Sequence, residues 1–305
     1  MGVKSGFEPE LSIGPRFRFA YIFKMVKMTP RYIDVDGYKY CEYFIPDLIR
    51  AAINYKPTDK DVFVATYPKC GTTWMIQKVM LILNKGKVPD TIEEYFSSCP
   101  FLEMLGPDEI SRMPGPGCIK IHFPFNLTPY SPDAKYVYVA RNPKDCCISF
   151  YHHTKAISCL LFPKMAHLMI SSISSSRVKQ ILMITSTTYC HGTSTEMIPM
   201  SFFVTYEEMK KESKDTIKKL AGFLGEEYSS ALADNEELLD EIALKSSFEY
   251  MQKTTNNLFI EMLDRCEEYA ENPNVPKGFK AWSKFNAIAI KDGQGSNETL
   301  LETVL

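Results

Sequence analysis

The chain has 305 residues, 45% of them hydrophobic, which is enough to bury a large core as either one α/β domain or two small ones. Its 35 basic and 37 acidic residues give a net charge of −2, so the overall charge does not favour nucleic acid or an anionic membrane as a partner. An anionic ligand would therefore need a local binding site.

Residues 1–30 contain no signal-peptide core and no membrane span, because Arg18, Lys24 and Lys27 interrupt each long apolar stretch. The nine cysteines are an odd number, form no CxxC pair and have no histidine partner at metal-binding spacing. They favour a reducing compartment, and the sequence offers no metal cluster.

A buried strand is predicted over Asp61–Tyr67, and the apolar spacing of Gly71–Leu83 predicts a helix after it. Two more strands are predicted at Cys118–His122 and Tyr136–Ala140. The Asn-Pro pair that follows supplies an N-cap and a first-turn proline for another helix. The chain therefore repeats a strand–turn–helix unit.

A further strand at Ser201–Tyr206 precedes a helix that ends at Gly225. Residues 158–200 are rich in Ser, Thr and Met, and only weak helix is expected there. Because strands alternate with helices, we expect an α/β fold with a mainly parallel central sheet flanked by helices on both faces.

The most specific motif is YPKCGTTW, residues 67–74, between the first of these strands and its helix. Gly71 allows close backbone approach, the helix-start amides point at an anion, Thr72 and Thr73 add hydroxyl donors, and Lys69 adds a positive charge. The turn is thus a candidate phosphate cradle, although Gly and Thr also occur in such turns for backbone reasons alone. The GxxxxGK[ST] spacing is missing, which disfavours a kinase or ATPase.

Two further sites follow later strands. Arg141 ends one strand and can bind a phosphate with its forked guanidinium, while Ser149, two turns into the next helix, can donate a hydroxyl to the same group. His122 ends another strand, where a histidine is more often a structural donor than a base. His152 and His153 are alternative bases.

Together these segments resemble the cytosolic sulfotransferases. The motif at 67–74 is similar to that family's 5′-phosphosulfate loop, and RNPKDCCIS at 141–149 is similar to its 3′-phosphate segment. KIHFP at 120–124 is similar to the family's Lys-x-His-Leu-Pro, with Phe123 in place of leucine. From about Tyr32 to Met251, the motifs occur in the same order and at the same spacing as in this family.

The resemblance implies a cytoplasmic enzyme that transfers a sulfuryl group from 3′-phosphoadenosine 5′-phosphosulfate (PAPS) to a phenol, amine or alcohol, without a metal. His122 would be the base, Lys69 would offset charge on the leaving phosphate, and Lys120 would orient or polarise the acceptor. The expected domains are an extension at 1–30, one sulfotransferase domain at 31–290 with a P-loop-like phosphosulfate turn, and a divergent tail at 291–305. No nucleic acid or membrane partner is expected.

The resemblance also assigns contacts to the nucleotide. Trp74 and Phe248 would stack on the adenine, Ser246 would bond the base edge, and Tyr206 would lie near it. The full set of expected nucleotide-binding residues is Lys69, Cys70, Gly71, Thr72, Thr73, Trp74, Arg141, Ser149, Tyr206, Ser246, Phe248, Lys277 and Gly278. Cys146 and Cys147 are expected to be small core residues rather than a redox pair.

The C-terminal part departs from the family, whose signature there is Arg-Lys-Gly, two variable residues and Gly-Asp-Trp. This chain has PKGFKAW at 276–282, with Pro276 in place of the arginine. Losing such a phosphate contact costs about 1.5–3 kcal/mol, so a nucleotide-binding protein without activity is the alternative hypothesis. The tail lacks the family's dimerisation string, which leaves the oligomeric state open.

Overall fold

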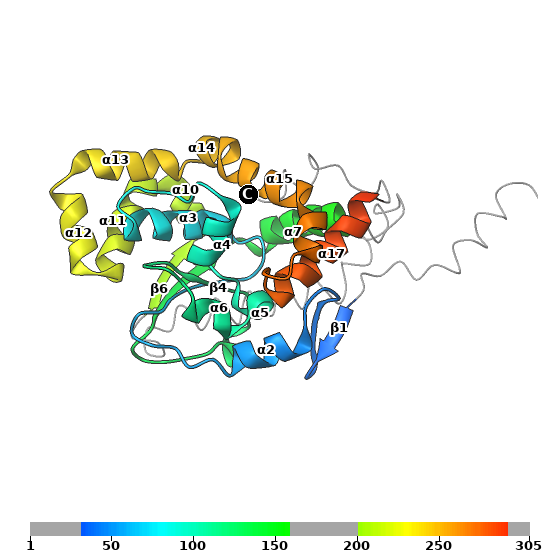
Figure 1. Cartoon of the computed structure of the whole chain (residues 1–305). Coiled ribbons are helices and arrows are strands. Elements are labelled where there is room, and N and C mark those ends of the chain that lie inside the picture. The colour runs from blue at the N-terminus through cyan, green and yellow to red at the C-terminus, as the bar shows by residue number, and fades with distance from the viewer. Residues whose placement is uncertain (1–31, 159–200, 292–305) are drawn as a thin grey trace, which may run out of the picture. The chain divides into compact units, whose positions relative to one another are not determined.

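A parallel sheet of four strands organises the part of the chain that the computed structural model describes, residues 32–158 and 201–291 (Figure 1). Its spatial order is β4 (Ile119–Ile121), β3 (Val62–Thr66), β5 (Lys135–Ala140) and β6 (Ser201–Thr205). This sheet confirms the predicted α/β fold. The expected extension at 1–30, nearly all of the segment 158–200 and nearly all of the tail at 291–305 lie outside the described residues.

Side chains along β3 alternate between two buried hydrophobic clusters. Val62 and Val64 belong to one cluster, which also contains residues of α3 (Thr72–Leu83) and α11 (Ser213–Leu224). Phe63 and Ala65 belong to the other, which contains residues of α2 (Pro46–Ile53). Because successive side chains of a strand point to opposite faces, helices cover both faces of the sheet, as predicted.

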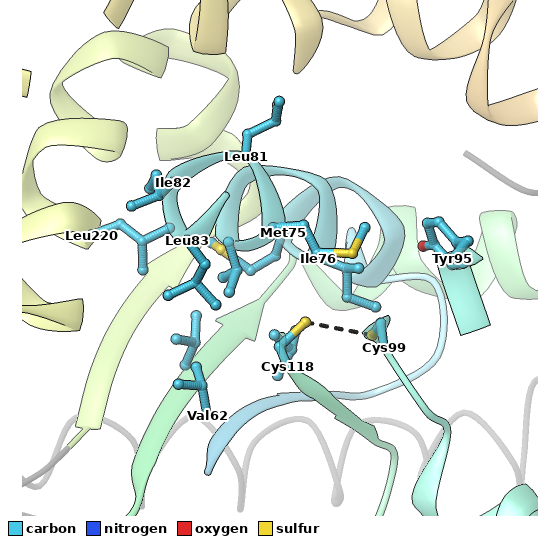
Figure 2. Close-up of a cluster of buried hydrophobic side chains, with 14 of the residues drawn as sticks. Val62, Met75, Ile76, Leu81, Ile82, Leu83, Tyr95, Cys99, Cys118 and Leu220 are labelled. Carbon is cyan, nitrogen blue, oxygen red and sulfur yellow. Dashed lines mark hydrogen bonds between the residues drawn. The ribbon is translucent and has the colours of Figure 1, made fainter. Parts of the chain in front are cut away.

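Figure 2 shows part of the first cluster, where the sheet residue Val62 lies below Leu83 of α3, and Leu220 of α11 lies beside Ile82 and Leu83. Helix α3 is apolar over most of its surface, and ten of its residues are buried, which explains why it forms the central helix of this face. The Sγ atoms of Cys99 and Cys118 lie 3.4 Å apart in the same cluster as free thiols.

A short hairpin precedes the sheet. Strands β1 (Tyr32–Val35) and β2 (Tyr38–Cys41) pair antiparallel around Asp36 and Gly37. Both turn residues have positive φ, 53° and 88°, as a two-residue type I′ hairpin requires. The amide of Gly37 also donates to Asp34 Oδ1 at 2.9 Å, which closes the turn.

The remaining helices pack around this sheet, and all the described elements belong to one compact unit that begins at residue 31. Among the described residues, no helix is long and apolar enough to cross a membrane. The bounds are α4 (Ile92–Ser98), α5 (Leu102–Leu105), α6 (Pro107–Ser111), the 3-10 helix η1 (Phe125–Leu127), α7 (Pro143–Ser158), α10 (Tyr206–Lys211), α12 (Glu226–Ala233), α13 (Glu236–Lys245), α14 (Phe248–Lys253), α15 (Thr255–Asp264), α16 (Cys266–Glu271) and α17 (Lys277–Lys291).

Candidate active site

The three motifs meet at the carboxyl edge of the sheet. The turn 67–71 follows β3, His122 follows β4, and Arg141 follows β5. After β3 the chain forms β4 on one side and then returns to form β5 on the other. Ligands of open α/β sheets bind at such a reversal, outside the carboxyl ends of the strands. The topology therefore brings together residues that are up to about seventy positions apart.

The turn after β3 is a left-handed one. Lys69 has φ 69°, and Gly71, the N-cap of α3, has φ 96°. A Cβ at Gly71 would lie 2.8 Å from Cδ2 of Tyr206 and 3.3 Å from Cε of Met209. The N-cap Gly71 has no side chain to bond the first amides of α3, so within the described part of the chain these amides are available to an anion.

Replacing Gly71 with alanine is expected to destabilise the protein by about 1–3 kcal/mol, because alanine is strained at this φ and would also contact the Tyr206 ring. Chemical denaturation would measure the change. The matched control is Gly222→Ala, since Gly222 lies within α11 with open space around its Cα. That variant should be stabilised by about 0.5–1 kcal/mol, and equal losses in both variants would contradict the explanation.

Three basic side chains act on one another in this region. Burial, followed by the charges of Lys120 and Arg141, lowers the pKa of Lys69 to about 8. Burial also lowers the pKa of Lys120. Arg141 donates from Nη1 to the carbonyl of Lys69 at 3.0 Å and lies 4.2 Å over the ring of Tyr206. Its buried Nε has no hydrogen-bond partner among the described residues, so an anionic ligand would complete the cluster.

His122 is held by the neighbouring strand. Ala65 of β3 pairs with Ile121 of β4, and the next residues along, Thr66 and His122, are hydrogen bonded. The ring Nδ1 lies 2.8 Å from the carbonyl oxygen of Thr66. A carbonyl only accepts, so Nδ1 carries the proton and Nε2 keeps its lone pair. Burial, followed by the charge of Lys120, lowers the pKa of His122 to about 3, and the ring is neutral at pH 7.

A cavity of about 210 Å³ extends from Lys69, Lys120 and His122 into an apolar region. Its polar lining includes Lys69, Gly71, Thr72, Thr73, Lys120 and His122, all of them predicted site residues. Aromatic side chains from distant segments line the rest, among them Tyr43, Phe96, Phe259, Phe279 and Trp282. Sequence reasoning missed these aromatic residues and Phe101, which also lines the cavity. His153, one of the alternative bases, lines the cavity as well.

A second group of predicted residues lies around Trp74. The indole Nε1 donates to the carbonyl of Ser246 at 2.7 Å, and the ring of Tyr206 meets the indole edge-on at 5.4 Å. The hydroxyl of Ser246 is buried and donates to Ile242 at 2.7 Å, so its contact to a base edge stays a prediction. Phe248 is 55% exposed, which leaves its ring accessible.

Four other predicted residues are placed as follows. Cys70 is fully buried with its Sγ 3.6 Å from that of Cys146, so only its backbone can meet a ligand. Ser149 is partly exposed on α7. Lys277 begins α17, and a Cβ at Gly278 would overlap the carbonyl of Met104 in α5. Close packing of α17 on α5 explains this glycine, and the binding roles of Lys277 and Gly278 stay predictions.

Comparison with known proteins decides the family. A family model described as "Sulfotransferase domain" matches residues 59–284 of this chain. The chain belongs to the sulfotransferase family. It is therefore an enzyme of the sulfuryl-transferring class, as the resemblance implied.

Curated relatives agree with this assignment. Sulfotransferase 1E1 of Bos taurus is 27% identical over 76% of this chain and 80% of its own length. The amine sulfotransferase of Oryctolagus cuniculus is 30% identical over 70% of this chain and 71% of its own length. Mouse sulfotransferase SULT7A1, solved in complex with PAP, has the same fold, with a TM-score of 0.55 and 20% identity over 72% of this chain and 76% of its own.

Proposed function

We propose that the protein transfers a sulfuryl group from PAPS to a hydroxyl or amine of a small aromatic acceptor in the cytoplasm, with residues 31–290 as the catalytic domain. The observation that carries the proposal is the free Nε2 of His122, in a ring that lines the same cavity as the phosphate turn. The amine sulfotransferase among the relatives and the PAP in the mouse structure support the acceptor and the donor.

The residues present fit the nucleotide. The buried, unpartnered Nε of Arg141 and the uncapped amides of α3 are donors suited to phosphate. Lys69, Thr72 and Thr73 would hold the 5′-phosphosulfate together with the backbone of Cys70 and Gly71. Arg141 and Ser149 would hold the 3′-phosphate, with Lys277 and Gly278 in support. When bound, PAPS supplies an activated sulfuryl group on a phosphate leaving group.

The aromatic residues would bind the base. Trp74 and Phe248 offer π-faces suited to a purine, and Tyr206 lies against Trp74. Ser246 holds the indole in place through its carbonyl. We infer that the adenine stacks on Trp74, near the position that Ser246 fixes.

Three side chains would carry the chemistry. Nε2 of His122 would take the proton from the hydroxyl or amine of the acceptor. As this proton leaves, the oxygen or nitrogen of that group would attack the sulfur in line with the departing phosphate. Lys69, positively charged below about pH 8, offsets the charge that develops on the leaving oxygen. Lys120, whose Nζ lies 4.4 Å over the Phe101 ring, orients the acceptor beside His122.

The aromatic side chains that line the cavity support a flat acceptor. The rings of Phe96 and Phe279 pack at 5.1 Å, and Phe279 stacks on Trp282 at 5.5 Å with an interplanar angle of 18°. Such surfaces bind planar hydrophobic groups. A phenol or an aromatic amine would therefore present its polar group to His122 while its ring stays among these side chains.

Arg141→Ala is expected to raise the Kd for PAP by about 10- to 100-fold, the cost of a charge-assisted hydrogen bond. Isothermal titration calorimetry would measure the Kd. The control is Arg112→Ala, since Arg112 is exposed and its side chain pairs with Glu109 at the surface. Equal affinities of wild type and Arg141→Ala would remove Arg141 from the nucleotide site.

The proposal as a whole is tested by transfer of radiolabelled sulfuryl from PAPS to a panel of small phenols, amines and alcohols. We expect labelled product with aromatic acceptors at neutral pH. PAP binding without turnover on any acceptor would instead support the nucleotide-binding alternative, and Pro276→Arg would then test whether the missing arginine is the cause.

A further inference from the structure

Glu103 is a buried carboxyl group next to His122 that the proposed mechanism does not use. It lies in α5, the residue is 2% exposed, and its Oε1 accepts the backbone N–H of His122 at 2.5 Å. The preceding Phe101 meets the ring of His122 edge-on at 5.2 Å. One short segment therefore contacts both the backbone and the ring of the proposed base.

The same segment is joined to β4. Phe101 forms a parallel bridge with Lys120, and the amide of Lys120 donates to the carbonyl of Pro100 at 3.0 Å. These bonds fix the backbone that carries Lys120 and His122. Glu103 therefore adds a side-chain contact at the end of an already paired strand.

A buried glutamate is energetically unfavourable if its side chain only binds the backbone amide of His122. Its Oε2 is buried without a hydrogen-bond partner in residues 32–158 and 201–291, and burying a carboxylate costs far more than burying the neutral amide of glutamine. Glutamine would offer the same acceptor to the amide of His122. The use of a carboxyl group here therefore points to a need for its charge.

The surroundings of His122 create that need. A proton taken up by this ring adds a positive charge close to Lys120, Lys69 and His153, and each of them disfavours it. Burial disfavours it further. The carboxylate of Glu103, which accepts the backbone N–H of the same histidine, is a negatively charged group that can balance this charge.

We propose that Glu103 is a positioning residue for His122. The carboxylate of Glu103 holds the end of β4 and balances the charge of the proton that the imidazole of His122 accepts. The inference rests on the base role proposed for His122. Glu103 touches neither substrate in this scheme and acts only through the histidine.

Glu103→Gln keeps the acceptor and removes the charge. We expect kcat to fall about tenfold, because an opposite charge nearby changes the pKa of its partner by about one unit or more. The KM values for PAPS and acceptor should stay within about twofold, since neither ligand contacts Glu103. Glu103→Asp, which retains the charge, should recover part of kcat. The control is Glu109→Gln, because Glu109 of α6 pairs with Arg112 just after that helix, and this variant should leave kcat unchanged.

The pH profile separates charge from structure. Burial raises the pKa of Glu103 to about 7, so its carboxylate forms as pH rises through 7 and kcat of the wild type should rise with it. His122 is neutral there and Tyr40 of β2 has its pKa raised to about 12, so neither of these facing groups titrates near pH 7. Lys69 and Lys120, whose pKa values burial lowers, are both retained in Glu103→Gln, so they cannot account for a difference between the two enzymes. In Glu103→Gln the rise near pH 7 should be absent.

A second measurement needs no turnover. The ¹³C signal of the Glu103 carboxyl should titrate near pH 7, and exchange of the His122 amide hydrogen should be at least about tenfold faster in Glu103→Ala than in wild type. Titration near the ordinary glutamate value, or unchanged exchange, would overturn the inference. So would an unchanged kcat in Glu103→Gln. Absence of turnover in the wild type would refute the proposed function, while the two spectroscopic results would still decide the role of Glu103.

Discussion

Replacing His122 with alanine is expected to lower kcat by about 10²- to 10⁴-fold, the usual contribution of a positioned general base. The affinity for PAP should change by less than about twofold, because the assigned phosphate contacts come from the turn after β3 and from Arg141. Sulfuryl transfer and calorimetric titration of PAP would measure the two effects. A large loss of kcat with an unchanged affinity for PAP is the result expected for a catalytic base.

The two neighbouring histidines of α7 make matched controls. His152 is exposed, and His152→Ala should retain wild-type kcat. His153 lines the cavity, so His153→Ala is expected to change KM for the acceptor more than kcat. A larger loss of kcat in His153→Ala than in His122→Ala would transfer the role of base to His153.

The phosphate turn could be predicted because its determinants are local. The strand 62–66, the left-handed glycine and the helix from Thr72 are contiguous, and each has its own pattern of burial, φ or periodicity. Cys146 was also predicted correctly as a core residue, since it is fully buried, whereas the same prediction was wrong for Cys147, which is partly exposed. Local patterns of this kind need no knowledge of the tertiary structure.

The aromatic wall of the cavity could not be predicted in the same way. Tyr43, Phe96, Phe259 and Trp282 come from separate segments, and in sequence each has the composition of an ordinary core residue. Only packing between distant helices shows which of these rings face the cavity. Composition also gives no sign that Gly278 is required by the contact between α17 and α5.

Glu103 has a weak signal in the sequence. It lies in the string PFLEML, residues 100–105, whose other members are apolar and include the core residues Phe101, Leu102, Met104 and Leu105. A single charged residue inside an apolar run indicates a buried charge, which proteins rarely keep without a function. The pattern could have identified the residue, but not its partner, because His122 is nineteen positions away.

Lys69→Met is expected to lower kcat by about 10²- to 10³-fold, the loss that follows removal of one donor to a developing negative charge. Methionine has an unbranched side chain like lysine, so the left-handed backbone at φ 69° is no more strained than before. Steady-state kinetics with PAPS at saturating acceptor would measure the change. The exposed Lys60, before β3, gives the control Lys60→Met, which should keep wild-type kcat.

The pH dependence of the same variant tests the charge directly. Burial and the charges of Lys120 and Arg141 lower the pKa of Lys69 to about 8, so its ammonium is present below pH 8 and is lost as pH rises through that value. Wild-type kcat should therefore decline above pH 8, whereas Lys69→Met, which has no ammonium to lose, should show no decline in that range. A decline of the same size in both would assign the alkaline limb to Lys120, whose pKa burial also lowers. In that case the charge that offsets the leaving phosphate would come from the acceptor side of the cavity rather than from the turn.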